Sequence, residues 1–120
     1  MGYTHYWRNK KGFTDEQWDE FTRLVNEDIL RWTDVPLTNG ISSDLNSSPI
    51  INSEKVSLNG RGEDGCETLL ITKKGCSFEF CKTRRLPYDE VVVDILKLAN
   101  KINKNFHPSS DGCEFDYLYL

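Results

Sequence analysis

The sequence lacks any run of apolar residues long enough to cross a membrane, since a spanning helix needs roughly 18 of them. Its polar opening, residues 1–5, also lacks the apolar segment of a secretory signal peptide. A basic excess is missing too, because 15 lysines and arginines stand against 19 aspartates and glutamates, for a net charge of −4. We therefore expect a cytoplasmic protein with no membrane segment. A protein that coats DNA without sequence preference is disfavoured, because such proteins are basic.

Cysteines and histidines are too few and too scattered for a recognisable metal site. Structural zinc sites usually show two close pairs of ligands, and here the second pair is missing. Disulfides are not expected in a cytoplasmic chain. We predict free thiols, no metal and no cofactor for these residues: Cys66, Cys76, Cys81, Cys113, His5 and His107.

The residues that are present suffice for one folded domain, residues 1–120. Hydrophobic residues make up 38% and aromatic residues 12%, which excludes global disorder. Alternating and helical patterns predict the order strand, helix, three strands, helix, strand. This order is typical of a two-layer α+β sandwich, in which two amphipathic helices pack on an antiparallel sheet of about five strands. The predicted strands cover 3–8, 54–58, 67–72, 77–83 and 113–120, and the helices cover 14–32 and 87–106.

The helix boundaries carry local signals. Thr14 can cap the first helix in a capping box with Gln17, and the apolar stripe from Trp18 to Trp32 is expected in the core. Pro87 suits the first residue of the second helix. The three middle strands would form a meander. Residues 33–53 are polar, rich in serine, and long for a loop inside a compact domain, so they form either a lid or a mobile excursion.

Gly60, Gly62 and Gly65 have the spacing of a dinucleotide-binding motif, but their context excludes it. The motif needs a following helix, and here a strand follows. Glu63 and Asp64 would also repel a phosphate. We interpret the segment as a glycine-rich connection between two strands.

Basic residues gather where the last middle strand meets the second helix. Residues 73–85 hold five basic side chains and one acidic one, although the whole protein is acidic. Alternation puts Phe78, Phe80 and Lys82 on one face of that strand, and Arg84 would continue this face if the strand extends that far. The strand runs into a helix N-terminus, whose unpaired amides favour anions.

This junction is our first candidate site. Lys82 and Arg84 would neutralise a phosphate, and Thr83 would add a neutral donor. Tyr88 would stack on a base or donate its hydroxyl. The alternative is a solvated edge with ion pairs among Arg84, Arg85, Asp89 and Glu90.

The aromatic strand at residues 3–7 is the second candidate. Three aromatic rings and a histidine within five residues suit recognition of a planar ligand. The alternative is a strand with one aromatic face, that of Trp7, in the core. A catalytic His5 would need a nucleophile, such as Cys66 or Cys81, brought close by folding. Alternation gives the strand two faces: Tyr3, His5 and Trp7 on one, and Thr4, Tyr6 and Arg8 on the other.

Several segments also resemble a family of small bacteriophage and bacterial proteins. The opening Met1-Gly2-Tyr3-Thr4-His5-Tyr6-Trp7 is the most specific of them. The resemblance implies a phage or prophage setting and a bacterial host cytoplasm, and it brings no settled activity to transfer. By analogy of size and setting, it suggests a sponge that binds a nucleotide signal of bacterial immunity. The other segments are Cys66-Glu67-Thr68, Phe80-Cys81-Lys82-Thr83, Pro87-Tyr88-Asp89 and Ser109-Ser110-Asp111-Gly112.

Together these patterns predict a binding protein that sequesters an anionic, nucleotide-like small molecule without cleaving it. The cations would hold phosphate, the aromatic strand would contact the base, and Ser110 or Asp111 would bond a ribose hydroxyl. No catalytic residue is assigned. The predicted ligand contacts are Thr4, His5, Tyr6, Trp7, Lys82, Thr83, Arg84, Tyr88, Asp89, Ser110 and Asp111.

Two alternatives remain open. One is an enzyme that cleaves or modifies such a ligand, using His5 with a carboxylate. The other is an inhibitor that docks on a host protein. We also predict a homo-oligomer, because residues 117–120 leave an apolar edge at the end of the last predicted strand.

Overall fold

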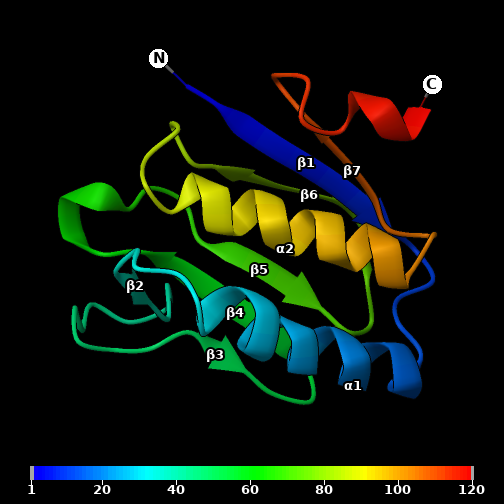
Figure 1. Ribbon diagram of the computed structural model, residues 1–120, viewed down its shortest axis with the longest axis horizontal. Coiled ribbons are helices and arrows are strands. Elements are labelled where there is room, and N and C mark those ends of the chain that lie inside the picture. Colours follow the sequence, from blue (N-terminus) through cyan, green and yellow to red (C-terminus); the bar gives the residue numbers. More distant parts are fainter. Residues whose placement is uncertain (1, 120) are drawn as a thin grey trace.

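The computed structural model describes residues 2–119 and has the α+β class that the sequence predicts (Figure 1). Its two α-helices lie side by side, and both cover the same side of the strands. The helices are α1 (Asp15–Leu24), continued by a π-helical segment (Val25–Leu30), and α2 (Asp89–Ile102). The strands are β1 (Thr4–Asn9), β2 (Leu37–Thr38), β3 (Ile50–Ile51), β4 (Lys55–Gly60), β5 (Leu69–Thr72), β6 (Cys76–Lys82) and β7 (His107–Ser110).

The strands form two antiparallel sheets instead of the single sheet that we expected. One sheet has the order β6-β1-β7, and in the other β4 pairs with β2, β3 and β5. The predicted meander of three middle strands is therefore wrong, because β6 pairs with β1 and not with β5. The reason lies in the turn at Gly75, which has φ +86° and packs against the Asn9 carbonyl so tightly that no side chain would fit. That contact turns the chain toward β1.

Helix α1 begins as its sequence indicates but ends differently. Thr14 caps it, and the reciprocal capping box with Gln17 is present. Trp18 and Val25 are buried as expected, whereas Trp32 is 71% exposed. Trp32 does not continue the buried apolar stripe, because the π-helical turns of residues 25–30 are wider than α-helical turns and shift the following residues off the buried face.

Helix α2 is shorter than predicted at both ends. It starts at Asp89, two residues after Pro87, and ends at Ile102. Its inward side chains are all buried and pack between the sheets and α1: Val91, Val92, Ile95, Leu96 and Ala99. Phe106 lies beyond the helix but is still buried, because the chain turns back through a bond from Phe106 N to the Asn103 carbonyl at 3.0 Å.

The last strand lies earlier than predicted. Residues 107–110 form β7, and residues 116–119 form a 3₁₀ turn instead of a strand. Pro108 sits in this edge strand, where its missing N–H removes no necessary hydrogen bond. The predicted assembly through a C-terminal edge strand therefore loses its structural basis.

Residues 33–53 are held to the second sheet by short strands and by side chains. Besides the pairing of β2 and β3 with β4, Ser57 Oγ donates to the Asn39 carbonyl at 2.7 Å and Thr68 Oγ1 to the Gly40 carbonyl at 2.6 Å. Within residues 2–119, no helix is both long and apolar enough to cross a membrane.

Candidate functional site

Segments far apart in the sequence meet where β1 begins and β6 and β7 end. The N-terminus of α2 reaches the same place (Figure 1). The backbone N–H groups of Thr83 and Arg84 both donate to the Tyr3 carbonyl, at 2.9 and 3.2 Å. Asp111 N donates to the Thr4 carbonyl at 3.0 Å. Both candidate regions of the sequence, the basic junction and the aromatic strand, are thus parts of one site.

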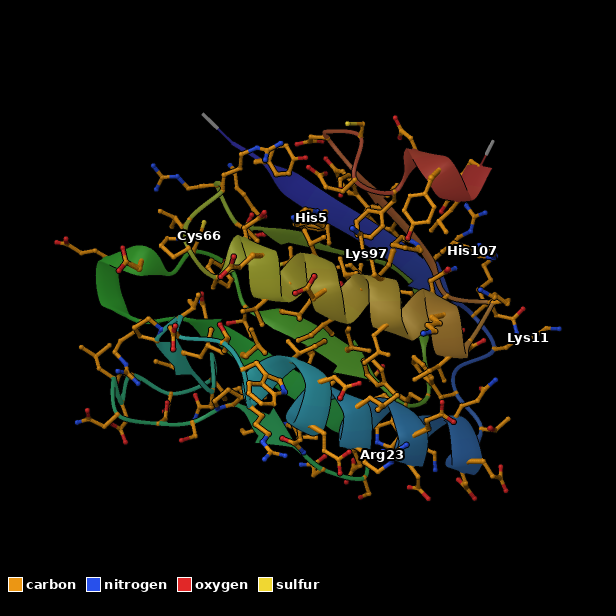
Figure 2. The ribbon with its side chains drawn as sticks, in the orientation of Figure 1. His5, Lys11, Arg23, Cys66, Lys97 and His107 are labelled. Atoms are coloured by element: carbon orange, nitrogen blue, oxygen red, sulfur yellow. The ribbon has the colours of Figure 1, made fainter. Side chains whose placement is uncertain are left out.

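His5 is the centre of this site and lies fully buried between β1 and α2 (Figure 2). Its Nδ1 is 2.5 Å from Ser110 Oγ, and its Nε2 is 2.6 Å from Asp89 Oδ1. The Thr83 hydroxyl donates to the same carboxylate oxygen. Because an ionised carboxylate only accepts, Nε2 carries a proton toward Asp89 and Nδ1 can accept from the Ser110 hydroxyl. Ser110, His5 and Asp89 therefore form a continuous hydrogen-bonded chain.

The C-terminal segment closes over His5. The rings of Tyr3 and Phe115 meet the imidazole edge to face, with centroids 5.3 and 6.2 Å away. The Tyr3 hydroxyl donates to the Glu114 carboxylate, and burial together with this bond raises the pKa of Tyr3 to about 12. Arg85 stacks on the Tyr3 ring at 3.8 Å and donates to Glu114 at 3.2 Å. We call Tyr3, Arg85 and Glu114 the latch.

Asp111 ties down the outer side of β1. Its Oδ2 accepts from the Thr4 backbone N–H at 2.9 Å, and its Oδ1 accepts from the Tyr6 hydroxyl at 2.8 Å. The second bond raises the pKa of Tyr6 above its usual value. Asp111 and Ser110 thus both bond within the protein. A ribose hydroxyl would have to compete with these bonds.

Four predicted ligand contacts are buried. Trp7 is only 3% exposed, and Tyr88 is fully buried with its hydroxyl donating to the Glu67 carbonyl at 2.7 Å. Thr83 and His5 are fully buried as well. These side chains point into the layer that the helices cover and not toward the outer surface, and their contact with a ligand stays a prediction. Strand alternation separates two faces, but it does not say which face the helices cover.

The start of α2 is also unsuited to an anion. Asp89 and Glu90 both lie in its first turn, so the helix dipole already faces the protein's own carboxylates. The contribution of this helix N-terminus to phosphate binding stays a prediction, and these carboxylates count against it. The remaining candidates for anion binding are side chains.

Lys82 and Arg84 are two exposed cations of the basic junction. Within residues 2–119 neither takes part in an ion pair, and Arg85 pairs with Glu114 instead of with Asp89 or Glu90. Arg84 and Arg85 have φ values of 56° and 55°, in the left-handed region that costs about 1–2 kcal/mol per residue with a side chain. Such backbone strain gathers at functional sites, where the surroundings impose it.

An aromatic surface covers the outer side of the three-stranded sheet. Phe78 and Phe80 are 57% and 51% exposed, and the register pairs Tyr6 with Phe80 and Thr4 with Lys82. The Phe78 ring lies 6.0 Å from Tyr6 and 6.2 Å from Phe80, centroid to centroid. We call Tyr6, Phe78 and Phe80 the aromatic platform. Phe78 and Phe80 are missing from the predicted contacts, although alternation had put them on the face of Lys82.

The loop of residues 33–53 borders this platform. Its Gly40 and Ile41 line an open depression of about 420 Å³ together with Leu70 and Phe80. Phe80, at the edge of the platform, therefore also forms part of the wall of this depression. Whether the loop closes as a lid stays a prediction.

No group of three or more histidine, cysteine, aspartate or glutamate side chains suited to hold a metal ion occurs within residues 2–119. The four cysteines are free, with Cys81 buried and Cys113 exposed. Burial raises the pKa of the Cys81 thiol to about 12, which makes it a poor nucleophile. No protein-family model, curated protein or solved structure matches the chain.

Proposed function

We propose that the protein binds an anionic, nucleotide-like small molecule and releases it chemically unchanged. The observation that carries this proposal is the aromatic platform, which is exposed to solvent and continues directly into Lys82, a cation that takes part in no ion pair within residues 2–119. Exposed aromatic side chains on the uncovered face of a sheet are uncommon unless they bind something. A base offers a flat apolar face to such rings, and a phosphate offers charge to the cation.

The cations define where the phosphate would lie. Lys82 follows Phe80 on the same strand face, one pleat further on. Arg84 lies just beyond, on a turn whose backbone is fixed by bonds to Tyr3 and Thr83. A rigid turn reduces the entropy that binding would otherwise cost. The phosphate position is therefore at the end of the platform near the latch.

Sequestration fits this inventory better than turnover does. Binding needs donors, a cation and an aromatic wall, all of which lie at the surface. His5, the strongest candidate for a general base, has no exposed surface. In the phage or prophage setting that the resemblance implies, the ligand would be a nucleotide signal of the host's immunity. The protein would then act as a sponge in the bacterial cytoplasm.

The test is a titration with nucleoside monophosphates, supported by mass spectrometry of any molecule that copurifies. We expect Arg84→Ala to weaken binding by about 10- to 150-fold, the equivalent of about 1.5–3 kcal/mol for a charge-assisted bond. Phe80→Ala should weaken it by a similar factor, because base stacking contributes about 1–3 kcal/mol. Arg23→Ala is the matched control, since Arg23 is an exposed cation on α1 (Figure 2). Affinity that survives Lys82→Ala and Arg84→Ala together would place the site elsewhere.

A second candidate is an enzyme, and one observation favours it. The chain Ser110–His5–Asp89 joins a hydroxyl, an imidazole and a carboxylate in the order used by serine hydrolases. Attack by Ser110 Oγ on an ester would pass its proton to His5 Nδ1. Ser110 is partly exposed, so a reagent could approach it.

Labelling with a fluorophosphonate distinguishes the two candidates. We expect the unmodified protein to gain no more mass from the reagent than Ser110→Ala does. Ser109→Ala is the control, because Ser109 is the exposed neighbour of Ser110. We also expect a bound nucleotide to be recovered intact after heat release. Stoichiometric labelling that is lost only in Ser110→Ala, with a cleaved product, would establish the enzyme and refute sequestration.

A further inference from the structure

A second group of basic side chains lies at the other end of the aromatic platform. Arg8, Lys10, Lys11 and His107 line an open depression of about 570 Å³, together with Ser77, Phe78 and Asn105. The lining contains no acidic side chain. Within residues 2–119, Arg8, Lys10 and Lys11 take part in no ion pair. We call Arg8, Lys10, Lys11 and His107 the distal cluster; the proposed function does not use it.

Arg8 and His107 of the distal cluster stand on the same face of the sheet as Lys82, and Lys10 and Lys11 follow in the turn after β1. Arg8 is paired with His107 across β1 and β7, and Thr4 is paired with Lys82 across β1 and β6. Arg8 and Thr4 are four residues apart on β1, which corresponds to about 13 Å at roughly 3.3 Å per residue. The platform lies between them, and Phe78 belongs both to the platform and to the distal depression.

This spacing decides what kind of ligand can use the whole surface. The two ends are about 13 Å apart along the backbone, so one phosphate group could contact cations at both ends only if both long side chains stretched toward each other across the rings. A chain with several phosphates and several bases can contact both ends and stack on the rings between them. That combination of a cationic track and aromatic rings is how proteins bind single-stranded nucleic acid.

The charge of the rest of the molecule limits the length of such a ligand. The protein carries a net charge of −4 although this face is basic, so the remaining surface repels a polyanion. A long strand that runs past the sheet would meet that repulsion. The favourable length is therefore a few nucleotides.

We infer that the ligand of the platform is a short single-stranded oligonucleotide, with bases on Tyr6, Phe78 and Phe80 and phosphates at Lys82 and at the distal cluster. This inference rests on the proposed function and names the class of its ligand. It adds the distal cluster to the site as a second phosphate contact. Duplex nucleic acid is excluded, because its bases are already stacked on one another and cannot lie on the rings.

The experiment is a series of fluorescence titrations of the full chain with thymidine monophosphate and with thymidylate oligomers of two, four and sixteen nucleotides. We expect the affinity to rise at least 30-fold from the monomer to the tetramer and then to level off. Arg8→Ala should weaken tetramer binding about tenfold and weaken monomer binding by a clearly smaller factor. It should also reduce the salt slope of tetramer binding by about 0.7, the value for one lost phosphate contact on a single strand. Arg8 is exposed, so this variant folds, and Arg23→Ala is the matched control.

Each outcome has one meaning. Equal affinity for the monomer and the tetramer would overturn this inference and leave the proposed nucleotide site in place. Tetramer binding that is weakened by Lys82→Ala but not by Arg8→Ala would also overturn this inference and leave the proposed nucleotide site in place. A duplex that competes as well as the single strand would overturn the role of stacking. Absence of binding by every member of the series would overturn both the inference and the proposed function.

Discussion

Replacement of Asp89 by alanine should destabilise the fold, because this carboxylate is the shared acceptor of two buried side chains. His5 and Thr83 are both fully buried, and each would lose its bond to Asp89. An unsatisfied buried donor costs about 1–3 kcal/mol. The Asp89 side chain is 15% exposed, so water can enter the vacated space and accept hydrogen bonds from the two donors. The cost for each donor should therefore lie in the lower half of that range. Loss of the negative charge at the start of α2 adds about 0.3–1 kcal/mol.

The expected total is about 3 kcal/mol, a large share of the roughly 5–15 kcal/mol that stabilises a domain of this kind. In urea this corresponds to a midpoint lowered by about 1–2 M, if the slope is about 1.5–3 kcal/mol/M. The fluorescence of the buried Trp7 and Trp18 reports the transition. Glu90→Ala is the control, because Glu90 is exposed in the same first turn and should change stability by less than about 1 kcal/mol. If Asp89→Ala and Glu90→Ala were equally stable, the hydrogen-bonded chain would not stabilise the fold, and our account of His5 would be wrong.

The remaining predictions concern the turn, the thiols and the latch. Arg84→Gly should keep or raise the melting temperature while it weakens nucleotide binding, because glycine adopts the left-handed backbone of that position without strain; a lower melting temperature would contradict this. At pH 8, iodoacetamide should label Cys113 within minutes and Cys81 only after unfolding, since Cys113 is exposed and Cys81 is buried with a pKa of about 12. Peptide mass mapping separates these two sites from the partly buried Cys66 and Cys76, and early labelling of Cys81 would refute the prediction. The pKa of Glu114 is lowered overall: burial raises it, but the hydrogen bond from the Tyr3 hydroxyl is among the causes that lower it more. The stabilisation that Glu114 provides is therefore present above its unfolded pKa and is lost as the pH falls through its folded pKa. Hydrogen exchange of residues 113–119, corrected for intrinsic rates, should therefore speed up below about pH 4 and should already be fast at pH 7 in Tyr3→Phe.

Local features of the fold could be predicted from the sequence because their signals are local. The capping box of Thr14 involves neighbours three residues apart, and the alternation of β6 is enough to put Phe80 and Lys82 on one face. The end of α1 could not be predicted, because the switch to π-helical turns at Val25 follows from how the helix packs and leaves no pattern in the sequence. For the same reason, Trp32 lies outside the core.

The arrangement of the site could be predicted only in part. The sequence singles out its residues separately, since His5, Asp89 and Ser110 are all among the predicted contacts. That they bond to one another could not be predicted, because the partners of His5 stand 84 and 105 positions later in the chain. The sequence also offers no sign that the second helix would cover the face of Trp7 and leave that of Tyr6 open. The prediction therefore assigned ligand contacts to both faces of β1.

The place of β1 in its sheet has a consequence for the order in which the protein folds. β1 is the central strand, and it stays unpaired until β6 and β7 have left the ribosome. The hairpin of β4 and β5 joins neighbouring segments and can form much earlier, since nearby contacts close at a smaller entropic cost. In the meantime, the apolar side of β1 is exposed to other chains and to chaperones. Pulse-labelling during refolding should therefore find the amides of β4 and β5 protected before those of β1.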